Sequence, residues 1–193
     1  PADAYVSDNP PFSILSEIRQ FYMERGIKYF LFAPHKNAFN NMKTCKDTRI
    51  PIDVTITYDN GAKIGTGFVT NVLGSDILIK TAPELLTALR RTIARTQGNK
   101  NNVLGVKNEY PLNLFPFQKL SAVRYADFQI KRSECEFIEK FKMRSDCETC
   151  NNIKSLGEYN GKPYGRFALI IPDSVVARYE AAVASVPKDA GKN

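Results

Sequence analysis

Residues 49 to 80 carry the pattern that most constrains how this chain folds. In the first part of this stretch, apolar side chains stand at every second position, with polar or small ones between them. The apolar positions are Ile50, Ile52, Val54, Ile56 and Tyr58. This spacing predicts a strand with one face in a core and one face in water. A turn sequence at 59–61 follows, and residues 64 to 72 and 77 to 79 are two further strand-sized runs.

The second run contains Gly65 and Gly67, which allow a strand to bend sharply. We therefore expect three consecutive antiparallel strands that begin a small β-barrel. Helical apolar spacing after Ser13 and after Pro172 predicts one helix near each end of the chain. The expected class is mainly β within α+β: a small antiparallel β-barrel with flanking N- and C-terminal helices and a long insertion.

The expected organisation is one barrel domain with accessory segments. Residues 1–45 are expected to form an N-terminal arm, a helix and an extended segment that pack on the barrel, the first 11 residues being a loose arm. Residues 46–187 are expected to form the barrel domain with its C-terminal helix, and 188–193 a polar tail. An insertion at about 83–150 interrupts the barrel. It contains a predicted helix, an irregular excursion, and strand-like runs at 120 to 130 and 135 to 143.

The charge of the chain favours anionic partners. Its 193 residues carry a net charge of +7, which suits nucleic acid, nucleotides or acidic protein surfaces. The predicted helix at 83–95 places Arg90, Arg91 and Arg95 away from its apolar face, as a possible anion or nucleic-acid contact. A solvated helix face explains the same arginines equally simply. No apolar run approaches the roughly 20 residues that cross a bilayer, and we expect a cytoplasmic protein without a membrane span.

Enzymatic and metal chemistry find little support. Cys147 and Cys150 form one C-x-x-C pair, and a tetrahedral zinc site needs two more ligands, so we expect no metal. His35 is the sole histidine, and no Gly-x-Ser-x-Gly or phosphate-binding glycine loop occurs. We therefore expect a protein that is not an enzyme and carries no cofactor.

The order of these features resembles the PilZ domain family. The matching segments are Arg49-Ile-Pro-Ile-Asp-Val, Gly65-Thr-Gly-Phe-Val-Thr-Asn71 and Tyr164-Gly-Arg-Phe167. The resemblance implies a barrel that binds cyclic di-GMP through an Arg-x-x-x-Arg entry and an Asp/Asn-x-Ser-x-x-Gly turn. Arginine suits this ligand because it forms bidentate bonds to phosphate and to guanine. The ligand-binding residues implied here are Arg49, Lys46, Asn71 and Ser75.

The chain departs from the PilZ motifs at three positions. Cys45 stands where the first arginine is expected, with Lys46 as a displaced substitute, while Leu73 and Asp76 replace the serine and the glycine of the turn. The resemblance thus implies a degenerate PilZ-like domain. We expect a regulatory binding module that acts mainly through protein–protein contacts, with weak or lost nucleotide binding and cyclic di-GMP as a possible ligand.

A second resemblance covers part of the same stretch. Residues 49 to 67 are also similar to the strand pair of Sm and Hfq proteins, in which a Val/Ile strand meets Asn-Gly and a Lys-x-x-Gly return. That family would imply RNA binding. The alternative function is therefore an Sm-like or other barrel that binds RNA or DNA through the basic helix face.

Overall fold

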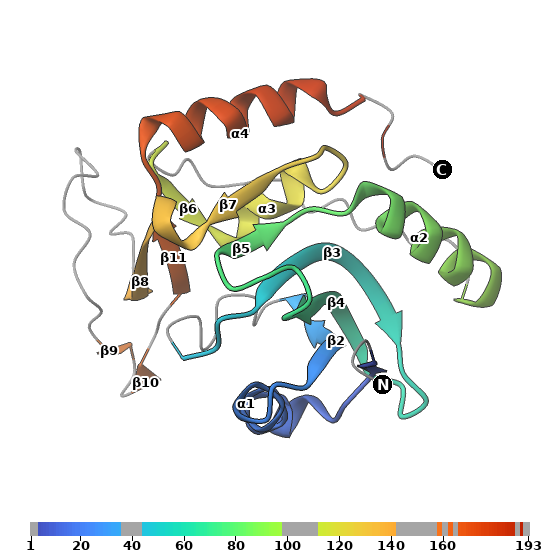
Figure 1. The fold of residues 1–193 in the computed structure, drawn as a ribbon. Coiled ribbons are helices and arrows are strands. Elements are labelled where there is room, and N and C mark those ends of the chain that lie inside the picture. Colours follow the sequence, from blue (N-terminus) through green and yellow to red (C-terminus); the bar gives the residue numbers. More distant parts are fainter. Residues whose placement is uncertain are drawn as a thin grey trace.

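The computed structural model of the chain describes residues 4–35, 44–97, 112–141, 158–159, 162–163, 166–187 and 190. These residues form an α+β fold with a mixed six-stranded sheet and four α-helices (Figure 1). The predicted C-x-x-C pair lies outside them.

The central sheet combines parallel and antiparallel pairs. Its strands, in spatial order, are β1 (Tyr5–Asp8), β2 (Lys28–Pro34), β4 (Lys63–Thr70), β3 (Thr48–Thr57), β5 (Ile77–Lys80) and β7 (Gln129–Lys131). β4 pairs antiparallel with both β2 and β3, whereas β1 runs parallel to β2 and β5 runs parallel to β3. The predicted hairpin of the first two strands is therefore confirmed. The third strand is different: β5 lies beside β3 and does not return antiparallel to β4.

The sheet is open, so the predicted barrel is not confirmed. In the described part of the chain, β1 and β7 are its two edges. The late strand β11 (Arg166–Ile170) does not close it, because β11 pairs antiparallel with β6 (Leu114–Pro116) and β8 (Glu136–Phe141) in a separate sheet. A two-stranded ladder of β9 (Glu158–Tyr159) and β10 (Lys162–Pro163) is the third sheet.

The chain before residue 46 contributes directly to the central sheet. Tyr5–Asp8, expected to be part of a loose arm, is the edge strand β1, and the extended segment that follows the first helix is β2. The helix between them, α1 (Leu15–Glu24), confirms the prediction of an N-terminal helix. The N-terminal segments are therefore part of the sheet.

Two helices cover opposite faces of the sheet. The side chains of Tyr29, Leu31 and Ala33 in β2 pack with α1, whereas Phe30 and Phe32, between them, face the cluster that contains the buried Leu86 of α2. α2 (Pro83–Gln97) is the predicted amphipathic helix. Burial on both faces explains why β2 is an almost continuous apolar run, a composition typical of central strands.

β3 follows the predicted alternation at its end and departs from it at its start. Side chains 54 to 58 alternate between the core and the surface, but residues 48 to 52 are all buried. The pairing register with β4 shifts between Ile50 and Val54, and Asp53 within this bulge has φ of 53°. Opposite the bulge, a Cβ on Gly67 would lie 2.8 Å from the carbonyl oxygen of Ile50, so this close approach requires glycine.

Besides the two core clusters that contact α1 and α2, a third cluster of buried apolar side chains joins β5 and β7 to the C-terminal part of the chain. α3 (Phe117–Val123) and α4 (Asp173–Ser185) contribute to it, together with β6 and β11 (Figure 1). α4 confirms the predicted C-terminal helix, and β8 confirms the strand-like run after Cys135. The run at 120 to 130 is divided between the end of α3 and β7, because residues 120 to 123 continue a helix.

No helix in the described residues has both the length and the hydropathy that crossing a membrane requires.

Candidate functional site

A buried carboxylate, Asp47, lies directly before β3 and contacts one of the residues implied by the PilZ resemblance, Arg49. Arg19 in α1 binds it with two bonds, from Nε to Oδ2 at 2.6 Å and from Nη2 to Oδ1 at 2.8 Å. The hydroxyl of Tyr29 donates to Oδ2 at 2.6 Å, and Nη1 of Arg49 donates to Oδ1. Charge-assisted bonds of this bidentate kind are the strong ones in proteins. The Asp47 cluster, as we call these four residues, therefore joins α1, β2 and β3.

The electrostatics of the Asp47 cluster follow from burial and pairing. Burial alone opposes ionisation of the carboxyl, but the charges of Arg49 and Arg19 outweigh it and hold the pKa of Asp47 below its ordinary value. Burial lowers the pKa of Arg49 to about 10, which still leaves its guanidinium charged at neutral pH. Burial and the neighbouring Asp47 raise the pKa of Tyr29, so its phenol keeps the proton that it donates.

Arg49 is therefore used inside the fold. Its side chain is 1% exposed and contributes to the Asp47 cluster, whereas the PilZ resemblance implies an arginine presented to a ligand. The signal that separates the two roles is Asp47 two residues earlier in the sequence. A ligand contact by Arg49 has no support in this geometry.

Asn71, Lys46 and Ser75 lie at the same end of the sheet as Arg49. Asn71 is half-buried, and its amide bridges two strands: Nδ2 donates to the carbonyl of Ile27 at 2.9 Å, and Oδ1 accepts from the backbone N–H of Tyr29 at 2.8 Å. Lys46 and Ser75 are exposed. Of the four implied ligand residues, two are thus structural and two are at the surface.

Arg132 organises this end of the sheet. It follows β7 in a short 3-10 turn, Arg132–Glu134. Its Nε donates to the carbonyl of Ser75 at 2.9 Å, and its Nη2 donates to the carbonyls of Cys45 at 3.2 Å and Asp47 at 2.5 Å. One guanidinium thus ties the start of β3 to the β4–β5 turn.

Two of the three predicted arginines of α2 lie on its outer side. Arg91 and Arg95 are exposed, and Arg90 is half-buried with its guanidinium 5.4 Å from the centroid of the Tyr125 ring. Arg124 lies 5.0 Å from the same ring. The helix is held by its other side, where Leu86 is buried. The basic α2 face, meaning Arg90, Arg91 and Arg95, is therefore a surface feature of a firmly packed helix.

A second buried polar cluster brings together residues that are far apart in the sequence. The carboxylate of Asp53 accepts from Ser121 Oγ at 2.8 Å and from Arg124 Nη1 at 3.2 Å, and lies 3.5 Å from Nε2 of His35. We call these four residues the Asp53 cluster. An aspartate within a strand opposite two glycines is the signal that could have indicated it, since Asp is depleted in strands.

The Asp53 cluster is enclosed rather than open to a substrate. The side chains of His35, Asp53 and Arg124 are all less than 10% exposed. Burial lowers the pKa of His35 to about 4, because the opposing effect of Asp53 is partly cancelled by Arg124. His35 is therefore neutral at physiological pH. The described residues contain no group of three or more His, Cys, Asp or Glu placed to hold a metal.

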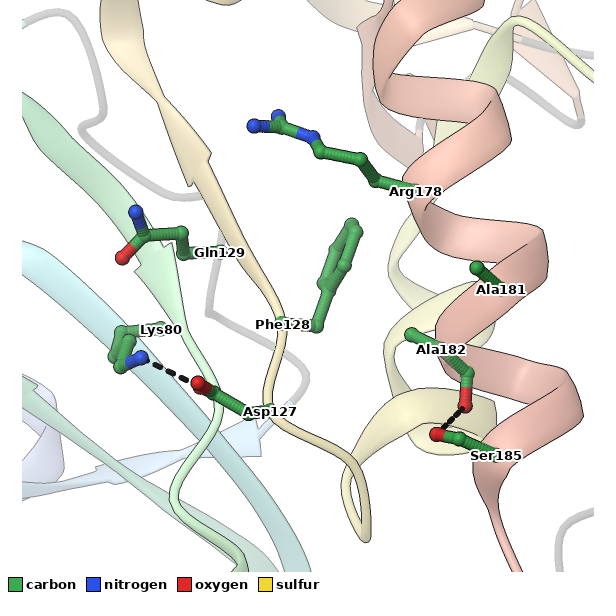
Figure 2. A pocket seen from close by; sticks show the side chains of 8 residues that line it. All are labelled: Lys80, Asp127, Phe128, Gln129, Arg178, Ala181, Ala182 and Ser185. Carbon is green, nitrogen blue, oxygen red and sulfur yellow. Dashed lines mark hydrogen bonds and ion pairs between the residues drawn. The ribbon is translucent and has the colours of Figure 1, made fainter.

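A shallow groove lies between β7 and α4, with a volume of about 510 Å³ (Figure 2). Phe128 forms part of its floor, and Lys80 and Arg178 lie on opposite sides. Each cation has a carboxylate partner: Lys80 pairs with Asp127 at 2.5 Å, and Arg178 pairs with Glu134 at 2.9 Å. The groove therefore offers little net charge to a ligand.

Comparison with known proteins adds no assignment to these sites: no family model, no curated protein and no solved structure matches the chain.

Proposed function

We propose that this protein is a non-catalytic regulatory binding module that contacts an acidic protein partner through the basic α2 face. The observation that carries the proposal is the pair of exposed arginines, Arg91 and Arg95, on this helix. Glu84 is the one acidic residue of α2 and lies in its first turn, so residues 85 to 97 present positive charge alone. Among the described residues, neither guanidinium has an ion-pair partner.

The burial of Arg49 in the Asp47 cluster supports a module that functions without a bound nucleotide. Turning Arg49 outward to a ligand would remove one of the two guanidinium groups that offset the buried charge of Asp47, and breaking a buried ion pair is destabilising. Lys46 and Ser75 remain available at the surface but lack the bidentate geometry that arginine supplies. The degenerate PilZ-like domain stays a prediction from sequence within this proposal.

Titration calorimetry with cyclic di-GMP tests the nucleotide part of the proposal. We expect no heat of binding at high micromolar ligand. One result would contradict our assignment of Arg49 to the fold. In that result the parent protein binds cyclic di-GMP, and the Arg49→Lys variant unfolds at the same temperature as the parent but no longer binds.

Fluorescence anisotropy tests the partner surface with a labelled peptide of alternating Glu and Ser as the probe. We expect Arg91→Glu with Arg95→Glu to weaken binding at low salt by more than tenfold, since both reversed charges then repel the peptide. The matched control is Lys63→Glu, which reverses one exposed charge at the start of β4. Equal effects per reversed charge in the two variants would show non-specific attraction by the whole chain and overturn the proposal.

A nucleic acid is the second candidate for the basic α2 face. The specific observation in its favour is Tyr125, whose ring has Arg90 and Arg124 within 5.4 Å and 5.0 Å, beside two exposed arginines. A salt titration with a labelled DNA duplex separates the candidates. Two exposed arginines that neutralise phosphates predict a log-log slope of about −2, and the peptide should then bind more weakly than the duplex at every salt concentration.

A further inference from the structure

One end of the central sheet presents apolar and basic side chains in alternation. Tyr5 is 61% exposed at the start of β1, and Val72 and Leu73 are 47% and 43% exposed in the β4–β5 turn. Lys28 is exposed at the start of β2, and Lys46 is exposed two residues before β3. We call these five residues the sheet-end strip.

The pairing register places the members of the strip side by side. Tyr5 is the partner of Lys28 in the parallel β1–β2 pair. The amide of Asn71 bonds to the residues on both sides of Lys28, so Val72 continues directly beside that lysine. Arg132 holds the carbonyls of Cys45 and Ser75 together, which brings Lys46 next to the other side of the turn. The order along the sheet end is therefore Tyr5, Lys28, the turn with its two apolar residues, and Lys46.

The charge of this end is positive. Neither Lys28 nor Lys46 has an ion-pair partner in the described part of the chain. The exposed carboxylate of the turn is Asp76, which accepts a bond from the Ser133 hydroxyl at 3.2 Å. Lys131, exposed at the end of β7, adds a further cation near Asp76, since it is the partner of Ile77.

We propose that the sheet-end strip docks on an anionic lipid surface. Aliphatic side chains at a turn tip insert into the boundary between headgroups and acyl chains, a tyrosine is favoured at the same depth, and lysines contact anionic headgroups. A protein interface would instead centre on a contiguous apolar patch with charges at its rim. Here lysines interrupt the apolar side chains, which suits a fluid surface that rearranges around them. This surface is separate from the basic α2 face, because α2 follows the opposite end of β5.

Co-sedimentation with vesicles tests the proposal. We expect the full chain to bind mixed phosphatidylcholine and phosphatidylglycerol vesicles at low salt and to dissociate as the salt concentration is raised. We expect no binding to vesicles of pure phosphatidylcholine. Lys28→Ala and Lys46→Ala should each lower the partition coefficient about fivefold. Val72→Asp with Leu73→Asp should abolish binding. The matched control is Lys63→Ala at the other end of β4, which should change little.

Tryptophan fluorescence gives a second measurement that does not depend on charge removal. The chain contains no tryptophan, so Leu73→Trp introduces a single reporter in the turn. Its emission should shift to the blue on adding mixed vesicles, whereas a tryptophan placed by Val183→Trp on α4 should not shift. Equal shifts at both positions would overturn the proposal, and so would binding that survives the two aspartates. Binding that is lost on Arg91→Glu with Arg95→Glu but kept by the strip variants would also overturn it.

Discussion

Asp47 and Asp53 are two buried carboxylates at nearly the same place in the chain, and they are held in different ways. Asp47 receives bonds of 2.6 to 2.8 Å from Arg19 and Tyr29, besides its pair with Arg49. Asp53 has one contact of 2.8 Å, and its contacts with Arg124 and His35 are 3.2 Å and 3.5 Å long.

The backbone shows the same contrast. Asp53 has φ of 53°, in a region that side-chain-bearing residues occupy at a cost of about 1–2 kcal/mol, whereas positive φ is not found at Asp47. The Asp47 cluster thus links three elements through charge, and the Asp53 cluster stabilises a bulge that is itself strained. We expect the first to dominate stability and the second to set its pH dependence.

Replacing Asp47 should have the largest effect. Asp47→Asn keeps the shape but removes the buried negative charge between Arg19 and Arg49, which should lower the free energy of unfolding by about 3–5 kcal/mol. Urea unfolding measures this, with Asp59→Asn at an exposed turn position as the control. A loss below about 1 kcal/mol, smaller than the hydrogen bonds involved, would show that the cluster is dispensable.

The pH dependence should report the Asp53 cluster. The folded pKa of His35 is lowered from 6.5 to about 4, so the unfolded chain binds the proton first as the pH falls. The contribution of neutral His35 to the free energy of unfolding should be fully present above pH 6.5. The free energy of unfolding should then decrease by about 3 kcal/mol in all as the pH falls from 6.5 to 4. Urea unfolding across this range measures the slope.

The variant His35→Gln should flatten that slope. The change in slope can be assigned to His35 because it is the one histidine in the sequence. The lowered pKa of Asp47 acts in a different window: its contribution is present above the ordinary value of 3.8 and is lost as the pH falls below it. An unchanged slope between pH 6.5 and 4.5 in the variant would contradict the burial of a neutral imidazole.

Two replacements of Asp53 distinguish how much its side-chain contacts and its strained backbone each contribute to stability. Asp53→Ala should cost about 2–3 kcal/mol, because Arg124 loses a buried partner and the positive φ remains. Asp53→Gly should be about 1 kcal/mol less damaging, because glycine adopts this φ without strain. Thermal unfolding of both variants measures the difference. If the alanine variant were the more stable of the two, the positive φ would not be a source of strain.

The smallest expected effect is that of Ser121→Ala. It removes one hydrogen bond to a carboxylate that keeps Arg124, and should cost about 1 kcal/mol. Tyr29→Phe makes the matching deletion in the Asp47 cluster, where the hydroxyl bond is 2.6 Å long. We expect the tyrosine change to cost more in the same urea titration. The reverse order would show that the two clusters contribute alike.

The sequence predicted local structure well where periodicity carried it. The first helix, the basic helix, the hairpin of β3 and β4 and the last helix all appear. The closed barrel did not, because closure depends on which distant strands pair: β11 joins β6 and β8, and β1 extends the sheet on the other side. The basic α2 face was found from its spacing, whereas the Asp53 cluster was missed because its members come from three separate segments.

The sequence by itself determined which stretches become strands and helices, since apolar spacing of two or of three to four residues is a property of neighbours. The tertiary structure alone decided the roles of the charged residues. Arg49 resembles a ligand arginine until Arg19, 28 residues before Asp47, completes the buried cluster, and Asp53 resembles a surface residue until Ser121, 68 residues away, donates to it. A charge is buried or exposed according to its partners in space, and those partners are far apart along the chain.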